Sequence, residues 1–147
     1  LEFRRVLFRS LFSAIGIAAS GFILGEKVGL IPEVCGPAWG PFGGCKTVEA
    51  SQWSSIGPIP IAAIGLIGSI VLFSATVIHA RTRREEALML WLFAGVAGSA
   101  IEIALIAIQA LFIGAWCGKC LIYGATVLIS AAAAISASLA HARSSRA

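Results

Sequence analysis

The stretch WCGKCLIYGATVLISAAAAISASLA, residues 116–140, decides the fold, because it joins a Cys-x-x-Cys motif to a long uncharged run. The motif is Cys117-Gly118-Lys119-Cys120, and no Asp, Glu, Lys or Arg occurs from residue 121 to residue 140. A helix needs about 20 apolar residues to cross the hydrocarbon core of a bilayer. The stretch therefore predicts a transmembrane helix over residues 117–140 with two thiols in its first turn.

Three earlier apolar runs have comparable length, at residues 6–24, 59–80 and 87–116. Of the 147 residues, 59% are hydrophobic and only 12% are charged, and the mean hydropathy is +0.94. A soluble domain of this size carries more charge, and four strands are too few to close a barrel in lipid. The sequence thus predicts an all-α membrane protein built as a four-transmembrane-helix bundle.

We expect residues 11–147 to form a single transmembrane domain, and we set residues 1–10 apart. Leu7-Phe8-Arg9-Ser10 is the translation of CTCTTCCGATCT, a common sequencing-adaptor sequence. We therefore interpret residues 1–10 as partly a library scar that replaces the native start. No functional argument rests on them.

Basic residues mark one side of the predicted bundle, and Lys/Arg excess is typical of the cytoplasmic side. They are Arg4, Arg5, Arg9, Arg81, Arg83, Arg84, Arg143 and Arg146. On the other side three lysines are balanced by three glutamates. We expect a multi-pass protein of the inner (plasma) membrane, with both termini in the cytoplasm and all four cysteines on the extracytoplasmic side. No basic stripe with stacking aromatics lies in a soluble stretch, so we do not expect a nucleic-acid partner.

The active loop predicted at residues 25–58 carries Cys35 and Cys45 between the first two spans. Every proline of the chain falls between residues 32 and 60, which excludes one continuous helix. We expect a folded extracytoplasmic cap, with a short helix at residues 46–55. Aromatic belts predict that three tryptophans lie near the outer headgroups and a fourth near the inner ones. These are Trp39, Trp53 and Trp116 outside, and Trp91 inside.

The Cys117/Cys120 pair favours redox chemistry. Helix-start amides and the Lys119 charge favour a thiolate, and Cys120 lies one turn deeper, toward lipid. A zinc half-site is the alternative, but a structural site needs four ligands, and a c-type haem needs His where Leu121 stands. Inert cysteines are the third interpretation.

Cys35 and Cys45 taken alone suggest a structural staple, since most disulfides in exported loops stabilise them. The nearby reactive pair favours a relay instead, because thiol exchange proceeds through mixed disulfides. We thus predict four catalytic cysteines and no metal.

Polar residues in the third span are a second candidate feature. Glu102 lies near mid-span, and Ser99 and Gln109 share its helical face. A mid-membrane carboxyl is costly and often functional, so Glu102 is a candidate proton donor; a hydrogen bond to a neighbouring helix is the equally weighted alternative. Glycines at helical spacing predict helix contacts: Gly65, Gly68, Gly95 and Gly98.

Two motifs resemble the vitamin K epoxide reductase family. The first runs from Cys45 through Ser51 to Gly57-Pro58, which opens a span holding Gly65. The second is Trp116-Cys117-Gly118-Lys119-Cys120-Leu121 at the head of the last helix. The loop cysteines are ten positions apart, a wider spacing than is usual in the family. Tyr123 falls three residues after the motif instead of four, so its role is not transferred.

The resemblance implies a four-helix bundle around a quinone pocket, with ubiquinone or menaquinone as cofactor. It implies that Cys35 exchanges with a separate thioredoxin-like (DsbA-like) partner and that Cys45 relays to Cys117. It further implies that Cys120 reduces the quinone and that Ser51 hydrogen-bonds its ring. We expect a monomer surrounded by membrane lipid.

Three functions remain open from the sequence. The first is a quinone-dependent thiol–disulfide oxidoreductase that supports disulfide bond formation. The second is a vitamin K-type quinone or epoxide reductase, which uses the same relay. The third is a non-catalytic membrane scaffold whose loop is merely stapled.

Overall fold

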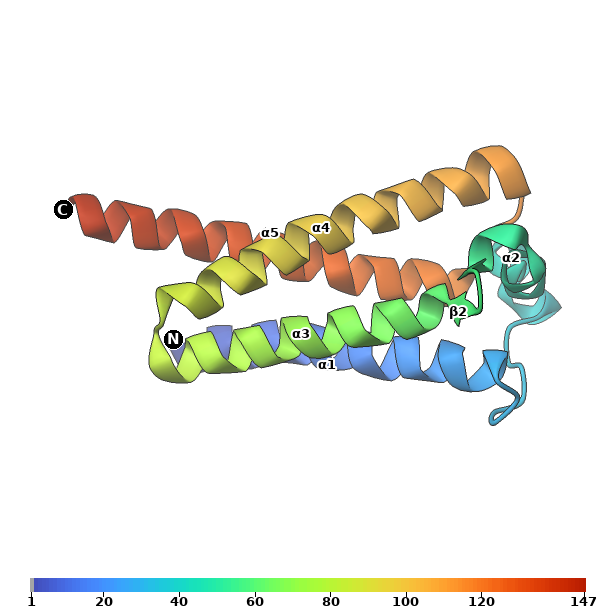
Figure 1. Ribbon diagram of the computed structural model, residues 1–147, viewed down its shortest axis with the longest axis horizontal. Coiled ribbons are helices and arrows are strands. Elements are labelled where there is room, and N and C mark those ends of the chain that lie inside the picture. Colours follow the sequence, from blue (N-terminus) through green and yellow to red (C-terminus); the bar gives the residue numbers. More distant parts are fainter. Residues whose placement is uncertain (1) are drawn as a thin grey trace.

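A computed structural model describes residues 2–147 of the chain as four long helices with a folded cap at one end (Figure 1). The long helices are α1 (Glu2–Lys27), α3 (Ile61–Thr82), α4 (Glu85–Ile108) and α5 (Gly118–Arg146). A π-helical turn, η3 (Gln109–Ile113), extends α4. All four helices are long and apolar enough to cross a membrane, which confirms the predicted bundle.

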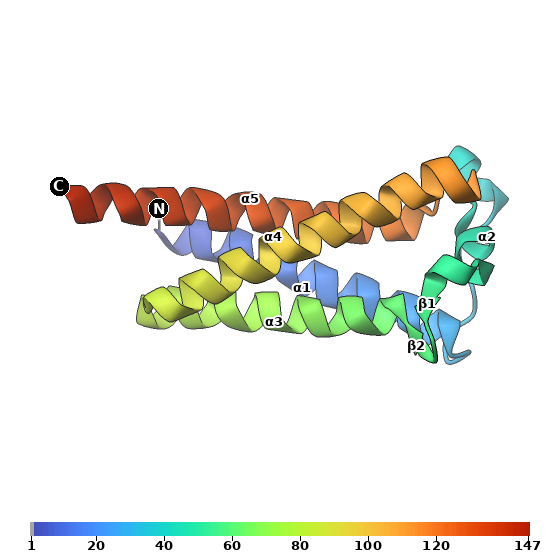
Figure 2. The ribbon, with the colours of Figure 1, turned by 45° about the horizontal axis from the view of Figure 1, so that its top comes forward.

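The helices pack in a closed order. Helix α1 contacts α3 and α5, and α4 contacts α5 and α3. Figure 2 shows α4 crossing over the others at an angle, from the turn after α3 to the cap end. Large apolar side chains such as Phe93 and Leu111 remain exposed on the outside, as lipid contact requires.

The predicted helix boundaries need correction. Helix α1 begins at Glu2, so the described part of residues 1–10 continues the first helix, and Leu1 lies outside the described residues. The third span ends at Ile113, short of residue 116, because Gly114 adopts a positive φ of 68° and its N–H returns to the Gln109 carbonyl at 2.8 Å. Helix α5 continues beyond residue 140 to Arg146.

The loop between α1 and α3 is a folded cap. It contains the 3-10 helix η1 (Pro37–Phe42), helix α2 (Cys45–Ala50), the 3-10 turn η2 (Gln52–Ser54) and two short antiparallel strands, β1 (Ser55–Ile56) and β2 (Ile59–Pro60). The helix predicted at residues 46–55 exists in two parts, because Ser51 is extended with ψ 157°. The cap lies at the end opposite to both termini (Figure 1).

The core away from the cap is built around Trp91, which corrects the predicted aromatic belt. Trp91 is fully buried and packs with Leu72, Leu88 and Ala134. Its indole N–H donates to the Ser130 hydroxyl at 3.1 Å, which satisfies the polar atom inside the bundle. Trp91 is thus a core residue and not a headgroup anchor.

Candidate functional site: two cysteine pairs beside an apolar cavity

Cys117 and Cys120 form a disulfide at the start of α5. Cys117 is the N-cap residue in extended conformation, and its sulfur accepts the Cys120 N–H at 3.3 Å. The Cys117 N–H donates to the Gln109 side-chain oxygen at 2.9 Å, which ties the motif to the end of α4. The first turn of α5 therefore holds both sulfurs in a fixed place.

Cys35 and Cys45 form the second disulfide, with their Cα atoms 6.0 Å apart. Cys45 opens α2, and Cys35 lies in the segment before η1. The Phe42 carbonyl oxygen lies 3.7 Å from one sulfur and 3.9 Å from the other. A disulfide sulfur carries no hydrogen, so these are close contacts and not hydrogen bonds.

The two pairs meet in one buried cluster. Cys35, Cys45 and Cys117 pack together, and Cys120 lies against them. A short backbone bridge joins the cap to the motif, since the Gly44 N–H donates to the Trp116 carbonyl at 2.9 Å and Gly43 pairs with Cys117. All four cysteines thus lie at the same end of the bundle, as the sequence predicted.

Two glycines permit this approach. A Cβ on Gly44 would lie 3.0 Å from the Trp116 oxygen, and a Cβ on Gly118 would lie 2.6 Å from the Trp39 ring. Side chains at these positions would push the cap away from α5. The glycine between the two sulfurs of the motif is therefore a packing requirement of the cap.

A cavity of about 310 Å³ lies beside the cysteine cluster, between the cap and the four helices. Its walls are mainly apolar, with Ile23, Ile61, Ile101 and Leu105 among them. Three predicted site residues line it together: Ser51, Glu102 and Cys120. The other three cysteines do not line it.

The predicted site residues differ in whether their polar atoms already have a hydrogen-bond partner within the protein. The Ser51 hydroxyl donates to the Val48 carbonyl at 2.6 Å, so it must rotate to donate elsewhere. Glu102 is more than nine-tenths buried, and within residues 2–147 its carboxyl has no hydrogen-bond or ion-pair partner. The hydrogen bond to a neighbouring helix that the sequence left open is absent from this described part of the chain. Ser99 is not in the cavity wall.

Sequence reasoning did not assign several polar residues of the cavity wall, namely Tyr123, Gln109, Ser20, Lys27, Glu49 and Ser54. Tyr123 lines it one turn below Cys120, donates its hydroxyl to the Gly65 carbonyl at 2.9 Å and accepts from Ser69 at 3.3 Å. Its position one turn after Cys120 was the available signal. Gln109 was noted only as a polar residue of the span, and it both lines the cavity and holds the Cys117 backbone.

The glycines predicted as helix contacts divide into two groups. Gly95 packs directly on Ala131 of α5, where an added Cβ would lie 3.1 Å from the Ala131 Cα, and Gly98 lies against Val127. A Cβ added to Gly68 would meet no other atom within 4 Å, and Gly68 lines the cavity, so for this residue the predicted helix contact was wrong. Gly65 combines both settings, since it contacts Tyr123 and lines the cavity.

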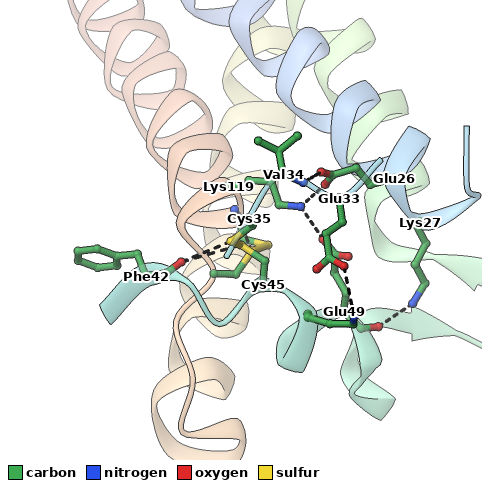
Figure 3. A network of polar contacts seen from close by, with 12 residues as sticks. Glu26, Lys27, Glu33, Val34, Cys35, Phe42, Cys45, Glu49 and Lys119 are labelled. Carbon is green, nitrogen blue, oxygen red and sulfur yellow. Dashed lines mark hydrogen bonds and ion pairs between the residues drawn. A yellow bond between two sulfur atoms is a disulfide. The ribbon is translucent and has the colours of Figure 1, made fainter. Parts of the chain in front are cut away.

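Lys119 does not supply the free positive charge that the sequence suggested. Its ammonium group is buried between the carboxylates of Glu26 and Glu49, at hydrogen-bond distance from both (Figure 3). Two negative charges therefore surround one positive charge beside the motif. In residues 2–147, no three His, Cys, Asp or Glu side chains are grouped as a metal site would need.

Comparison with known proteins gives one match. The sequence model described as Vitamin K epoxide reductase family matches residues 7–135, which include both motifs, all four cysteines and the four long helices in large part. A search of curated proteins gave no match, and neither did a search of solved structures.

Proposed function

The chain belongs to the vitamin K epoxide reductase family, and from this premise we propose that it is a quinone-dependent thiol–disulfide oxidoreductase that reoxidises a thioredoxin-like extracytoplasmic partner. Members of the family are oxidoreductases with quinone-linked chemistry on thiols or epoxides. One observation carries the proposal. A buried cluster joins the two disulfides, and Cys120 extends from it into the wall of an apolar cavity.

The electron path follows from this arrangement. A thiolate of the reduced partner attacks Cys35, and the resulting exchange leaves Cys35 and Cys45 as thiols and the partner as a disulfide. The Cys45 thiolate then attacks the Cys117 sulfur and releases the Cys120 thiolate. Attack of Cys35 on Cys45 closes the first disulfide again and releases Cys117. Each exchange moves two electrons inward without another oxidant.

Cys35 suits the entry role because it is the less buried cysteine of its pair. It is 8% exposed, whereas Cys45 and Cys117 are completely buried. A macromolecular thiol needs more access than this, so the segment before η1 must move when the partner docks. We propose that this partner is a separate DsbA-like protein and that one chain holds the whole relay as a monomer.

The cavity fits a quinone by size and chemistry. Ligand pockets of this kind start at about 300 Å³ and combine apolar walls with a few polar groups. A bound quinone, ubiquinone or menaquinone, supplies the acceptor for two electrons and two protons. Cys120 would face it from the start of α5, while Ser51, Tyr123 and Glu102 offer hydroxyl and carboxyl groups to its oxygens. Glu102 is the candidate that donates a proton from inside the bundle.

The decisive test is complementation of a bacterial host that lacks its own quinone-linked thiol oxidase. We expect the wild-type chain to restore disulfide formation, and each Cys→Ala variant at positions 35, 45, 117 and 120 to abolish it. A partner whose second active-site Cys is replaced by Ala should accumulate a mixed disulfide with Cys35 of the wild-type chain, because its remaining thiolate breaks the Cys35–Cys45 bond and no second partner thiol can resolve the product. Mass spectrometry identifies this bond. Activity that survives Cys117→Ala or Cys120→Ala would contradict the relay. Conversion of a quinone epoxide, without thiol oxidation of a protein partner, would favour the epoxide reductase alternative.

A further inference from the structure

A buried cluster of three charged residues lies directly beside the cysteines. Lys119 is in contact with Glu26 and with Glu49, whose carboxylate oxygen is 3.1 Å from the ammonium nitrogen. The Lys119 side chain is 7% exposed, Glu26 1% and Glu49 17%. Burial of this degree separates the cluster from ordinary surface ion pairs, which contribute little.

Each member of this charge cluster belongs to an element that carries a redox cysteine or positions one. Lys119 stands between Cys117 and Cys120 on α5. Glu49 is one turn after Cys45 on α2. Glu26 lies in the last turn of α1, and its second carboxylate oxygen accepts the Val34 N–H at 2.9 Å, directly before Cys35. Figure 3 shows Lys119 between the two carboxylates, next to the Cys35–Cys45 disulfide.

Disulfide exchange depends on how the elements that carry the cysteines are placed relative to one another. Thiol–disulfide exchange needs the attacking sulfur close to and in line with the bond it breaks. The cap carries Cys45, and it must also move to admit a partner at Cys35. A cap that moves therefore needs an interaction that returns Cys45 to Cys117.

We propose that the Glu26–Lys119–Glu49 cluster is an electrostatic clamp that positions Cys45 against Cys117 for disulfide exchange. The inference rests on the proposed relay and assigns these three side chains as positioning residues that do not react. The Glu49–Lys119 contact links α2 to α5. Glu26 links the segment before Cys35 to α5, because it binds both the Val34 N–H and the Lys119 ammonium group. Charge-assisted hydrogen bonds in a buried setting are the strong kind, so the closed cap is favoured.

Lys27 reinforces the same closed position from α1. Its ammonium group donates to the Glu49 backbone carbonyl at 2.6 Å and to the Ser54 hydroxyl at 3.1 Å. Both acceptors lie on the cap, one in α2 and one in η2. The end of α1 thus holds the cap through consecutive residues, Glu26 by its carboxylate and Lys27 by its ammonium group.

The test measures closure of the Cys45–Cys117 bond without quinone or partner. A Cys35→Ala, Cys120→Ala background leaves Cys45 and Cys117 as the only cysteines, and a mild chemical oxidant closes them. Free thiols are counted over time with a polymer-tagged maleimide after denaturation. We expect the closure rate to fall about tenfold or more in Glu49→Gln and Lys119→Met, since hydrogen bonds to charged groups are lost.

Two controls separate positioning from general stability. The matched control is Glu33→Gln, which removes the exposed 3.8 Å pair with Lys46 on the same cap and should leave the rate unchanged. The conservative variant Lys119→Arg keeps the charge and should restore most of the rate. Glu49→Gln is isosteric and partly exposed, so it keeps the test valid if Glu26→Gln does not fold.

The outcomes are distinct. Equal closure rates in Glu49→Gln, Lys119→Met and Glu33→Gln would overturn the clamp. So would a loss of rate that Lys119→Arg does not restore, because that pattern indicates packing and not charge. Failure of the wild-type chain to couple thiols to quinone would instead overturn the proposed function, and the closure assay does not depend on that coupling.

A second measurement uses the intact four-cysteine protein. A small dithiol can reduce Cys117–Cys120 without the cap, whereas a protein thiol must act through Cys35 and Cys45. Lys119→Met and Glu26→Gln change side chains that do not line the cavity, whereas Glu49 does line it. These two variants should lose quinone reduction driven by a thioredoxin-like protein and keep the reaction driven by the small dithiol. Equal loss with both reductants would contradict a role confined to the relay.

Discussion

At the scale of single residues, Glu102 stands out because its carboxyl is buried and packing alone gives no reason for a polar group there. Its carboxyl lines the cavity, and no hydrogen-bond partner for it occurs among residues 2–147. Gly124 of α5 lies against this carboxyl, since an added Cβ there would be 3.0 Å from a Glu102 oxygen. Gly124 follows Cys120 by four residues, a rise of about 6 Å along the helix. Glu102 thus faces the lower part of the space that Cys120 faces from above.

Replacement of Glu102 by Gln tests the proton-donor role. The amide keeps the volume and can still donate a hydrogen bond, but it has no acidic proton to give. We expect the turnover rate with quinone to fall about 100-fold, a typical loss for a general acid, while quinone affinity stays close to the wild-type value. Steady-state kinetics and a separate binding titration check the two quantities. A Gln variant with wild-type turnover would show that Glu102 only fills space.

Trp91 gives a prediction about stability. Replacement by Ala removes a fully buried side chain packed on Leu88 and Ala134 and leaves the Ser130 hydroxyl without its partner. We expect the free energy of unfolding to fall by about 3 kcal/mol, as for other large core deletions. Unfolding in detergent, followed by circular dichroism, measures the change. Trp116→Ala is the control, because Trp116 is 36% exposed and should cost far less.

The sequence predicted the position of the cysteines better than the surroundings of the site. Cys-x-x-Cys at a helix start has a local signature, so the cysteines could be found from spacing alone. Lys119 could not be read correctly, because its partners Glu26 and Glu49 are far away in the chain and meet it only in the fold. Trp91 was misassigned for a similar reason. Only the packed helices show that the Trp91 ring faces the core.

At the scale of elements, the contact between α4 and α5 depends on Gly95. A Cβ at this position would lie 3.1 Å from the Ala131 Cα, and backbone cannot yield as a flexible side chain does. We expect Gly95→Val to destabilise the bundle by about 2 kcal/mol, the cost of overpacking, as measured by thermal unfolding in detergent. Gly68→Ala is the matched control on α3, since nothing lies within 4 Å of its added Cβ and alanine favours helix.

The long helices followed from hydropathy, whereas the cap did not follow from any periodic pattern. Its elements are short and are placed by tertiary contacts, such as the Trp53 ring against Phe112 with centroids 5.7 Å apart. The proline and glycine content predicted a folded loop without giving its path. The end of α2 at Ser51 is a further feature that no periodic pattern predicted. Ser51 caps this helix and also lines the cavity.

At the scale of the whole molecule, the two ends of the bundle differ in charge as well as in chemistry. The cap end holds the cysteines and balanced charges, and the opposite end holds both termini and the arginine-rich turn after α3 (Figure 2). Excess Lys/Arg on short loops favours retention in the cytoplasm. We therefore expect the cap to be extracytoplasmic, where a thiol oxidase meets its partner.

Reporter fusions test this orientation. A phosphatase that is active only outside the cytoplasm, inserted at the exposed Gly29 turn of the cap, should be active, and the same reporter after Arg146 should be silent. A fluorescent protein that folds only in the cytoplasm should give the inverse result. Replacing Arg81 and Arg84 by Glu should shift part of the population to the opposite orientation, because the charge difference across the membrane falls. An active phosphatase at the C-terminal fusion of the unmodified chain would place the cysteines on the cytoplasmic side, where reducing conditions would oppose the proposed disulfide relay.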